Sequence, residues 1–499
     1  MFFSDSAAAI YRRWLKSQTA LACLAVLLFA LSAAFCGLQL EPDYFWHVKL
    51  GEWIVQHQSI MEADTFSWTA QEYPVTEFAH SWLGSVVIYL FSLLGRYFSY
   101  QHAGAILYEL CFYAILFGIL LFVQRQDISD LGSDLTVSSL LAIFPALCTV
   151  TVSPRPQAMG YILFALTLYL LRSWEKRKGS VLRVYFLPLI ALLWANLHGG
   201  TTPMMLAFCT GTLLMSFARV EAGQFTFNET PRKRKIHLAA ATGLSGITML
   251  INPYGFKLFL YSFLYNNSAC KEGIQEWMPA TIYSGFGLVF LVLFAVIIAF
   301  SNRKFTLVSI VPVILSGGLT LLYVRGTPYL GIAMSFFLTD SLARYTGDIG
   351  RPVKKGILWG VLLCISGLLL LYGGVHFPET RDTWEKASWH VSDTMANEIK
   401  SGHYKRLYND YNTGGMLIYY GIPVFIDSRA DLYPEEVLRD GKELSTLTGN
   451  PEEILTRYDF DAILVDTSSP LYDYLSINSK YHLEYEETNL ALFEPNNRM

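Results

Sequence analysis

The amino-acid sequence predicts a polytopic α-helical membrane protein that ends in a soluble α/β domain. Apolar residues make up 53% of the 499 residues and charged residues only 16%, and the mean hydropathy is +0.34. Long apolar stretches recur as far as residue 374, whereas charge rises and apolar runs shorten after it. We therefore expect a membrane domain over residues 1–374 and a soluble domain over residues 375–499.

The first apolar stretch, residues 19–40, follows Arg12, Arg13 and Lys16, as the apolar part of a signal peptide would. Crossing ~30 Å of hydrocarbon takes about 20 apolar residues, and this stretch is long enough. It also lacks an evident small-residue cleavage site. We expect an uncleaved first span with the N-terminus in the cytoplasm.

Further apolar stretches are long enough, or nearly so, to cross the membrane as well. They cover residues 102–124, 136–153, 157–171, 181–197, 202–219, 237–252, 282–300, 305–323, 328–343 and 355–374. Together with the first span they give about 11 crossings, or about 12 if the shorter apolar run at 81–97 also crosses.

Basic clusters test the order of these spans. They precede the first span and recur at 172–183, 232–235, 303–304 and 351–355. All of them can be cytoplasmic if 81–97 does not cross fully, because the number of crossings between successive clusters is then even. This favours a re-entrant or surface-lying segment at 81–97, and it places the loop 41–80 and residues 375–499 outside.

The first outer loop, residues 41–80, holds side chains that suit a carbohydrate. Aromatic faces can pack on a sugar ring, and carboxylates can accept hydrogen bonds from its hydroxyls. The candidate binding residues are Trp46, His47, Asp64, Glu77 and His80. For the aromatic residues, a membrane-interface belt is the alternative interpretation.

Asp43 is the candidate catalytic base. It directly follows the first span, where a carboxylate is costly unless water or a partner meets it. An enzyme that moves a sugar onto a hydroxyl needs a base to take the hydroxyl proton. His47 lies four residues on, shares a helical face with Asp43 and is expected to orient it.

Arg155, His198 and Arg325 are the candidate donor-phosphate ligands. All three come at the expected outer ends of spans, Arg155 between two prolines and His198 before two glycines. A fixed cation there can hold a phosphate, and arginine does so with two parallel N–H groups. Side chains that merely reach toward the headgroups are the alternative.

The soluble domain is expected to contain short buried strands at 424–426, 462–465 and 491–493, and helices at 437–447 and 451–458. Asp427 and Arg429 follow the first of these strands, and ligand groups commonly lie at the carboxyl ends of strands. We expect them to seat the acceptor or to dock the domain over the membrane cavity. A local ion pair that closes a turn is the alternative.

Other chemistries lack their motifs. The sequence has no P-loop, no dinucleotide-binding glycine pattern, no HExxH and no usable GxSxG. Its seven cysteines are irregularly spaced, and the net charge is −4, so we expect neither a structural zinc nor a nucleic-acid partner. No cofactor is certain; the loop carboxylates leave a divalent metal open.

Several motifs resemble the GT-C superfamily of integral-membrane glycosyltransferases, in particular a group of its bacterial members. They are DYFWHVKLGE at 43–52 and the segments 64–67, 153–157, 194–200, 252–255, 276–277, 409–415 and 425–431. In that superfamily a carboxylate after the first span serves as base or acceptor ligand, and Asp43 matches it. Only one acidic pair is present here, in Glu41-Pro42-Asp43, where many members show two adjacent ones. Glu41, Asp64 and Glu77 therefore remain alternatives for the base.

The resemblance implies a multi-pass protein of the bacterial cytoplasmic membrane that moves a sugar from a polyprenyl-phosphate donor. The acceptor would be a saccharide, lipid or protein on the outer face. One rival is a transporter or flippase for a lipid-linked saccharide, which would favour paired halves with broken helices. Another is a non-catalytic subunit of a polysaccharide assembly complex.

The topology is testable with reporter tags. Tags placed within 172–180 and 232–236 should report the cytoplasm, because basic loops stay on that side. A tag after residue 499 should report the outer side. A cytoplasmic C-terminus would contradict the topology and the predicted position of the site.

Overall fold

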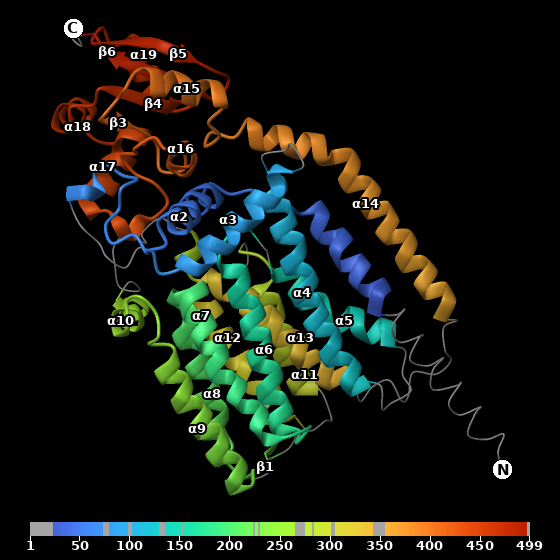
Figure 1. The fold of residues 1–499 in the computed structure, drawn as a ribbon. Helices are drawn as coiled ribbons and strands as arrows, with labels where there is room; N and C mark the ends of the chain where they lie inside the picture. The colour runs from blue at the N-terminus through green and yellow to red at the C-terminus, as the bar shows by residue number, and fades with distance from the viewer. Residues whose placement is uncertain are drawn as a thin grey trace, which may run out of the picture.

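The computed structural model describes residues 23–72, 79–97, 102–128, 135–150, 153–222, 225–227, 230–264, 275–281, 284–300, 305–342 and 355–496. A bundle of long helices carries a smaller α/β part at one end (Figure 1). That end, drawn at the top of Figure 1, is called the upper end below.

The bundle helices follow the predicted apolar stretches. They are the helix Cys23–Cys36, α4 (Ala103–Ile128), α5 (Leu135–Thr149), α6 (Gln157–Glu175), α7 (Leu187–Leu197), α8 (Thr202–Met215), α9 (Arg232–Thr248), α11 (Gly287–Phe300), α12 (Leu307–Leu322), α13 (Thr327–Leu342) and α14 (Lys355–Glu385). Two described helices, Ala103–Gln126 and Gly360–Glu385, are long and apolar enough to cross a membrane, and shorter apolar helices accompany them. The mostly helical fold class is confirmed, and the number of crossings stays a prediction.

A buried ion pair joins two helices at the lower end of the bundle. Arg172 in α6 donates from Nη2 to Asp340 Oδ1 in α13 at 2.6 Å, and from Nη1 to Asp340 Oδ2 at 3.0 Å. Arg172 is 4% exposed, so removing one partner would leave the other charge buried alone. The basic residues that begin α9 lie at the same end, opposite to the α/β part (Figure 1).

Two shorter helices, α2 (Asp43–His57) and α3 (Trp82–Arg96), lie across the upper end at an angle to α6 and α7 (Figure 1). Gly51 lets them approach closely, since any Cβ there would collide with the Ser85 carbonyl. Helix α3 covers the undecided segment 81–97. Whether that segment crosses the membrane stays a prediction.

Short elements complete the bundle. A small antiparallel hairpin, β1 (Val220–Ala222) with β2 (Phe225–Phe227), precedes α9. Helix α10 (Phe256–Leu264) and the 3₁₀ turns η3 (Gly199–Thr201), η6 (Gln275–Trp277) and η7 (Val324–Gly326) contribute to the cavity described below.

The C-terminal part contains a mixed sheet with the order β3-β4-β6-β5. Strand β3 pairs parallel with β4, and the other two pairs are antiparallel. Its elements are α15 (Asp393–Ser401), β3 (Leu407–Tyr408), α16 (Gly414–Tyr420), α17 (Glu435–Thr446), α18 (Pro451–Tyr458), β4 (Ala462–Asp466), α19 (Pro470–Ile477), β5 (Tyr481–Glu486) and β6 (Leu490–Pro495).

Most of the elements predicted for this part are confirmed. Strands β4 and β6 and helices α17 and α18 stand where the sequence predicts them. The strand predicted at 424–426 is wrong: this segment is buried, but it lies outside the sheet, and only Val424 forms an isolated bridge, to Ser67 of the first outer loop. Helix α14 runs through residue 374, and the domain boundary there stays a prediction.

Candidate functional site

A cavity of ≈ 890 Å³ lies at the upper end of the bundle, below residues 411–412 and 428–431 of the C-terminal part. It gathers residues from α2, α8, α12 and the turns η6 and η7. Most of the predicted site residues line it together: Asp43, Trp46, His47, His80, Arg155, His198, Arg325 and Arg429. Residues far apart in the sequence thus meet at one place.

Arg155 is the centre of the charged end of this cavity. Its Nη2 lies 3.1 Å from Asp43 Oδ2 and its Nη1 3.4 Å from Glu276 Oε1, while Nε contacts Glu41. The Tyr108 hydroxyl donates to the Arg155 carbonyl at 2.6 Å and so fixes the backbone of the turn. Burial alone would lower the pKa of Arg155, but the three carboxylates raise it, so the guanidinium stays charged.

Arg325 lies beside this cluster. Its Nε is 3.8 Å from Glu276 Oε2, and its guanidinium stacks over the Trp277 ring at 4.7 Å. With its amide turned so that the oxygen faces Arg325, Gln157 accepts from Nε at 3.2 Å. Glu276 therefore bridges the two arginines that were predicted to hold a phosphate.

Sequence reasoning did not select Glu276 as a site residue. The only signal was the dipeptide at 276–277 among the GT-C-like motifs, with no spacing that pointed to Arg155 or Arg325. Trp277, Tyr261 and Tyr411 line the same cavity and were missed for the same reason. Their part in the site depends on how η6, α10 and the C-terminal part meet.

His47 and His198 serve as neutral hydrogen-bonding groups. His47 Nδ1 lies 2.8 Å from Ser85 Oγ, and His198 Nδ1 lies 2.9 Å from Thr201 Oγ1. Burial lowers the pKa of both imidazoles well below the usual value, and nearby arginines lower it further. His198 is thus not the cation that the sequence suggested, and His47 pairs with Ser85 instead of orienting Asp43.

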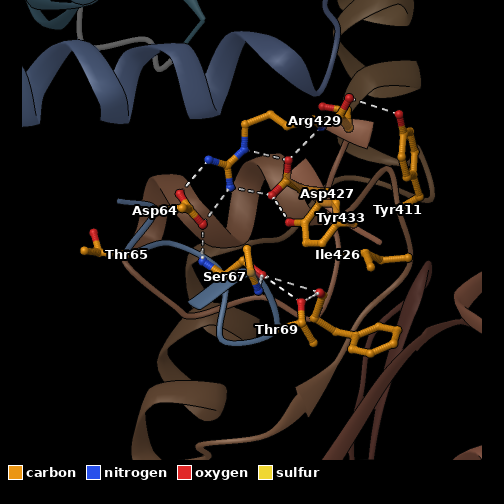
Figure 2. A network of polar contacts seen from close by, with 12 residues as sticks. Asp64, Thr65, Ser67, Thr69, Tyr411, Ile426, Asp427, Arg429 and Tyr433 are labelled. Atoms are coloured by element: carbon orange, nitrogen blue, oxygen red, sulfur yellow. Dashed lines mark hydrogen bonds and ion pairs between the residues drawn. The ribbon is translucent and has the colours of Figure 1, made fainter. Parts of the chain in front are cut away.

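Arg429 is held between two carboxylates rather than pointing freely at the cavity. It donates to Asp64 Oδ1 from Nη1 at 2.7 Å, and to Asp427 from Nε at 2.8 Å and Nη2 at 2.6 Å, as Figure 2 shows. Tyr433 also donates to Asp427. Asp64 and Asp427 are 4% and 0% exposed and do not line the cavity. We call Asp64, Asp427 and Arg429 the buried clamp.

Backbone pairing extends the clamp. The Val424 N–H donates to the Phe66 carbonyl at 3.0 Å, and the Trp68 N–H donates to the Val424 carbonyl at 3.1 Å. Thr69 Oγ1 donates to the Phe425 carbonyl, beside Ser67 in Figure 2. The first outer loop and the C-terminal part are therefore joined along both backbone and side chains.

A second contact ties the C-terminal part to the bundle. The Tyr261 hydroxyl of α10 donates to Asp431 Oδ2 at 2.6 Å, and Gly415 in α16 packs so tightly on Pro42 that a Cβ would collide with its carbonyl. The C-terminal part is thereby held over the cavity. Glu77, the remaining predicted ligand, lies outside the described residues.

One wall of the cavity is apolar. Helices α8 and α12 supply this wall: Met204, Ala207, Phe208, Leu315, Gly318, Leu319 and Leu322. Among these residues, Ala207, Gly318 and Leu322 are exposed. One cavity thus combines a charged cluster with an apolar wall.

The open question of a metal was tested on the side chains. No group of three or more His, Cys, Asp or Glu residues in the described ranges is arranged to hold a metal ion. At the cavity, three carboxylates contact the guanidinium of Arg155 instead. The sequence-based suggestion of a divalent metal therefore gains no ligand set from the described residues.

Known structures identify the fold. The chain is similar to the oligosaccharyltransferase of Archaeoglobus fulgidus tethered with an acceptor peptide, with a TM-score of 0.53, 10% identity and coverage of 89% of this chain and 69% of that one. For AglB from the same organism, in complex with an inhibitory peptide and a dolichol-phosphate, the TM-score is 0.52 and the identity is 10%, with coverage of 89% of this chain and 69% of that one. For the apo form of the A. fulgidus oligosaccharyltransferase, the TM-score is 0.53 and the identity is 9%, with coverage of 91% of this chain and 69% of that one.

At this identity the likeness shows the fold alone. The predicted GT-C fold is confirmed, since these oligosaccharyltransferases have it and the match spans most of the chain. No protein-family model matches the sequence, and no curated protein sequence matches it. Activity must be argued from the cavity itself.

The buried clamp predicts a large loss of stability when Arg429 is removed. Arg429→Met leaves Asp64 and Asp427 buried without a cation, which should lower stability by about 3–5 kcal/mol. Arg439→Met is the matched control, because the Arg439 side chain is 57% exposed and its ion-pair distances are 3.9–4.0 Å; it should cost about 0–1 kcal/mol. Thermal unfolding of the full chain in detergent would measure both, and equal melting temperatures would show that the clamp does not hold the parts together.

Proposed function

We propose that this protein is a membrane glycosyltransferase that moves a sugar from a polyprenyl-phosphate donor to an acceptor hydroxyl on the outer face of the membrane. The observation that carries this proposal is a cavity lined both by a charged cluster and by an apolar wall. Arginines and a carboxylate meet in the cluster, and helices α8 and α12 supply the apolar wall. A lipid-linked sugar has the same division between a charged head and an apolar tail.

Arg155 and Arg325 are suited to the donor phosphate. Both line the cavity, and Glu276 between them fixes their relative position. Guanidinium groups can each offer two N–H donors to phosphate oxygens. They would also stabilise the charge that grows on the phosphate as the sugar leaves.

Asp43 is suited to act as the base. It lies 3.1 Å from Arg155, so the carboxylate stands beside the group that would bind the leaving phosphate. In the proposed step the acceptor oxygen attacks the anomeric carbon while Asp43 takes the hydroxyl proton. The bond from that carbon to the phosphate oxygen breaks, and the phosphate keeps the electron pair, which inverts the anomeric centre.

The alternative bases are less suited to this role. Asp64 is committed to Arg429 and does not line the cavity. Burial raises the pKa of Glu41 even though Arg155 opposes the rise, and Glu41 does not line the cavity either. Glu77 lies outside the described residues.

The structural neighbours agree with a lipid-linked donor. One of them is a complex with a dolichol-phosphate and an inhibitory peptide, and another is tethered with an acceptor peptide. For this chain the acceptor stays open among saccharide, lipid and protein. A flippase is less favoured, because the charged residues gather at one end of the cavity rather than at the bilayer midplane between paired repeats.

Asp43→Asn should abolish transfer without abolishing donor binding. The change keeps the size of the side chain but removes the base, so transfer should fall by a factor of about 10²–10⁴. Transfer of labelled sugar from a membrane lipid extract, with binding of a polyprenyl phosphate measured in parallel, would test this. Asp473→Asn is the control on an exposed residue of α19. Normal transfer by Asp43→Asn would rule out Asp43 as the base.

Gly318→Phe should weaken binding of the lipid tail. A Cβ at Gly318 meets nothing within 4 Å, so the new ring can enter the cavity at its apolar wall without disturbing α12. We expect the affinity for a polyprenyl phosphate to fall by about tenfold or more, equal to about 1.4 kcal/mol.

Gly367→Phe supplies the matched control for this substitution. Gly367 is an exposed glycine of helix α14 that also has open space around its Cβ position, but it does not line the cavity. Isothermal titration of both variants with a polyprenyl phosphate compares their affinities for the lipid. Equal affinities would place the lipid tail elsewhere.

A further inference from the structure

The charged end of the cavity carries more negative than positive groups. Arg155 and Arg325 face Glu41, Asp43 and Glu276, all joined by contacts to one or both arginines. Two cations against three carboxylates leave this cluster with a formal charge of −1. A phosphate placed on Arg155 would add a further negative charge to a partly buried site.

Glu41 is the carboxylate that we expect to take up a compensating proton. Its side chain is 26% exposed, against 45% for Glu276 and 15% for Asp43, so water screens Glu41 less than Glu276. Asp43 lines the cavity, whereas Glu41 does not. Burial raises the pKa of Glu41, and Arg155 is the main group that opposes this rise. A donor phosphate that shares the charge of Arg155 weakens the group that keeps Glu41 ionised.

The surroundings of Glu41 support the same direction. Six residues bring charged or titratable groups to it: Asp43 of α2, Arg155 of the turn before α6, Glu276 of η6, Arg325 of η7, Glu109 of α4 and Tyr161 of α6. Apart from the two arginines, each of these groups is neutral or negative. An arriving anion therefore finds no further cation among them that could compensate Glu41.

We infer that binding of the anionic donor is coupled to the uptake of one proton by Glu41, an inference that rests on the proposed function. The proton comes from solvent and converts the Glu41 carboxylate into a carboxylic acid. The neutral side chain can stay beside Arg155 Nε, the atom that its carboxylate contacts, so the guanidinium keeps its position. Glu41 is then a positioning residue: its protonation frees the charge of Arg155 to bind the donor phosphate, and its ionisation lets Arg155 pair with the carboxylates again.

The sign of the pH dependence follows from linkage. Bound donor raises the pKa of Glu41 above its value in the free protein, so affinity rises as pH falls between these two pKa values. The slope is at most about tenfold in affinity per pH unit. Above this window Glu41 stays ionised in both states, and below it Glu41 is protonated in both, so the affinity levels off.

Isothermal titration of the full chain with methyl farnesyl phosphate tests this inference. This phosphodiester has one negative charge that does not titrate near neutral pH, unlike a phosphate monoester. Titration in buffers of different ionisation enthalpy counts the protons taken up. We expect about one proton per ligand inside the pH window for the native chain.

Two matched substitutions assign the proton. In Glu41→Gln, the side chain at position 41 is already neutral before the ligand binds. This variant should therefore bind methyl farnesyl phosphate without proton uptake, and above the pH window it should bind more tightly than the native chain. Glu276→Gln also removes one carboxylate from Arg155, but it should keep the uptake. Full uptake by Glu41→Gln, or its loss in Glu276→Gln, would overturn the inference, and so would binding by the native chain without uptake. Failure of the native chain to bind the phosphodiester at any pH would instead contradict the proposed function.

Discussion

The buried clamp of Arg429 between Asp64 and Asp427 is the contact on which the upper half of the structure depends. It joins two residues that are 365 positions apart in the chain, and its members are between 0% and 4% exposed. Charges buried this deeply are tolerated only while all partners are present. The first outer loop and the C-terminal part therefore hold one arrangement, and the cavity between them has a defined upper wall.

Two arginines of the site have different tasks that follow from their surroundings. Arg429 is enclosed by two carboxylates that do not line the cavity, so its charge is used for structure. Arg155 is 20% exposed in its side chain and meets carboxylates at the cavity itself. Its charge can be shared with a ligand. The same residue type thus fixes the fold at one position and faces the proposed donor at the other.

Hydropathy and charge were enough to predict the helices, because a span is a local pattern of about 20 residues. The same reasoning found Asp43, Arg155 and Arg325, since each is a polar residue at the end of an apolar stretch. It failed at 424–426, where a buried apolar run pairs with Ser67 of the outer loop instead of joining the sheet. It also missed Glu276, because pairings between distant segments leave no periodic signal in the sequence.

The pairing between residues 66–68 and 424 has a consequence for biosynthesis. The chain is made from its N-terminus, and at about 5–20 residues per second roughly 20–70 s separate Asp64 from Arg429. During that time Asp64 lacks the cation that it meets in the finished protein. Residues 64–69 must therefore stay hydrated, or be shielded by another protein, until residues 424–429 have been made. Assembly of the cavity is then one of the final events of folding, so a truncated chain that inserts all its helices would still lack a completed site.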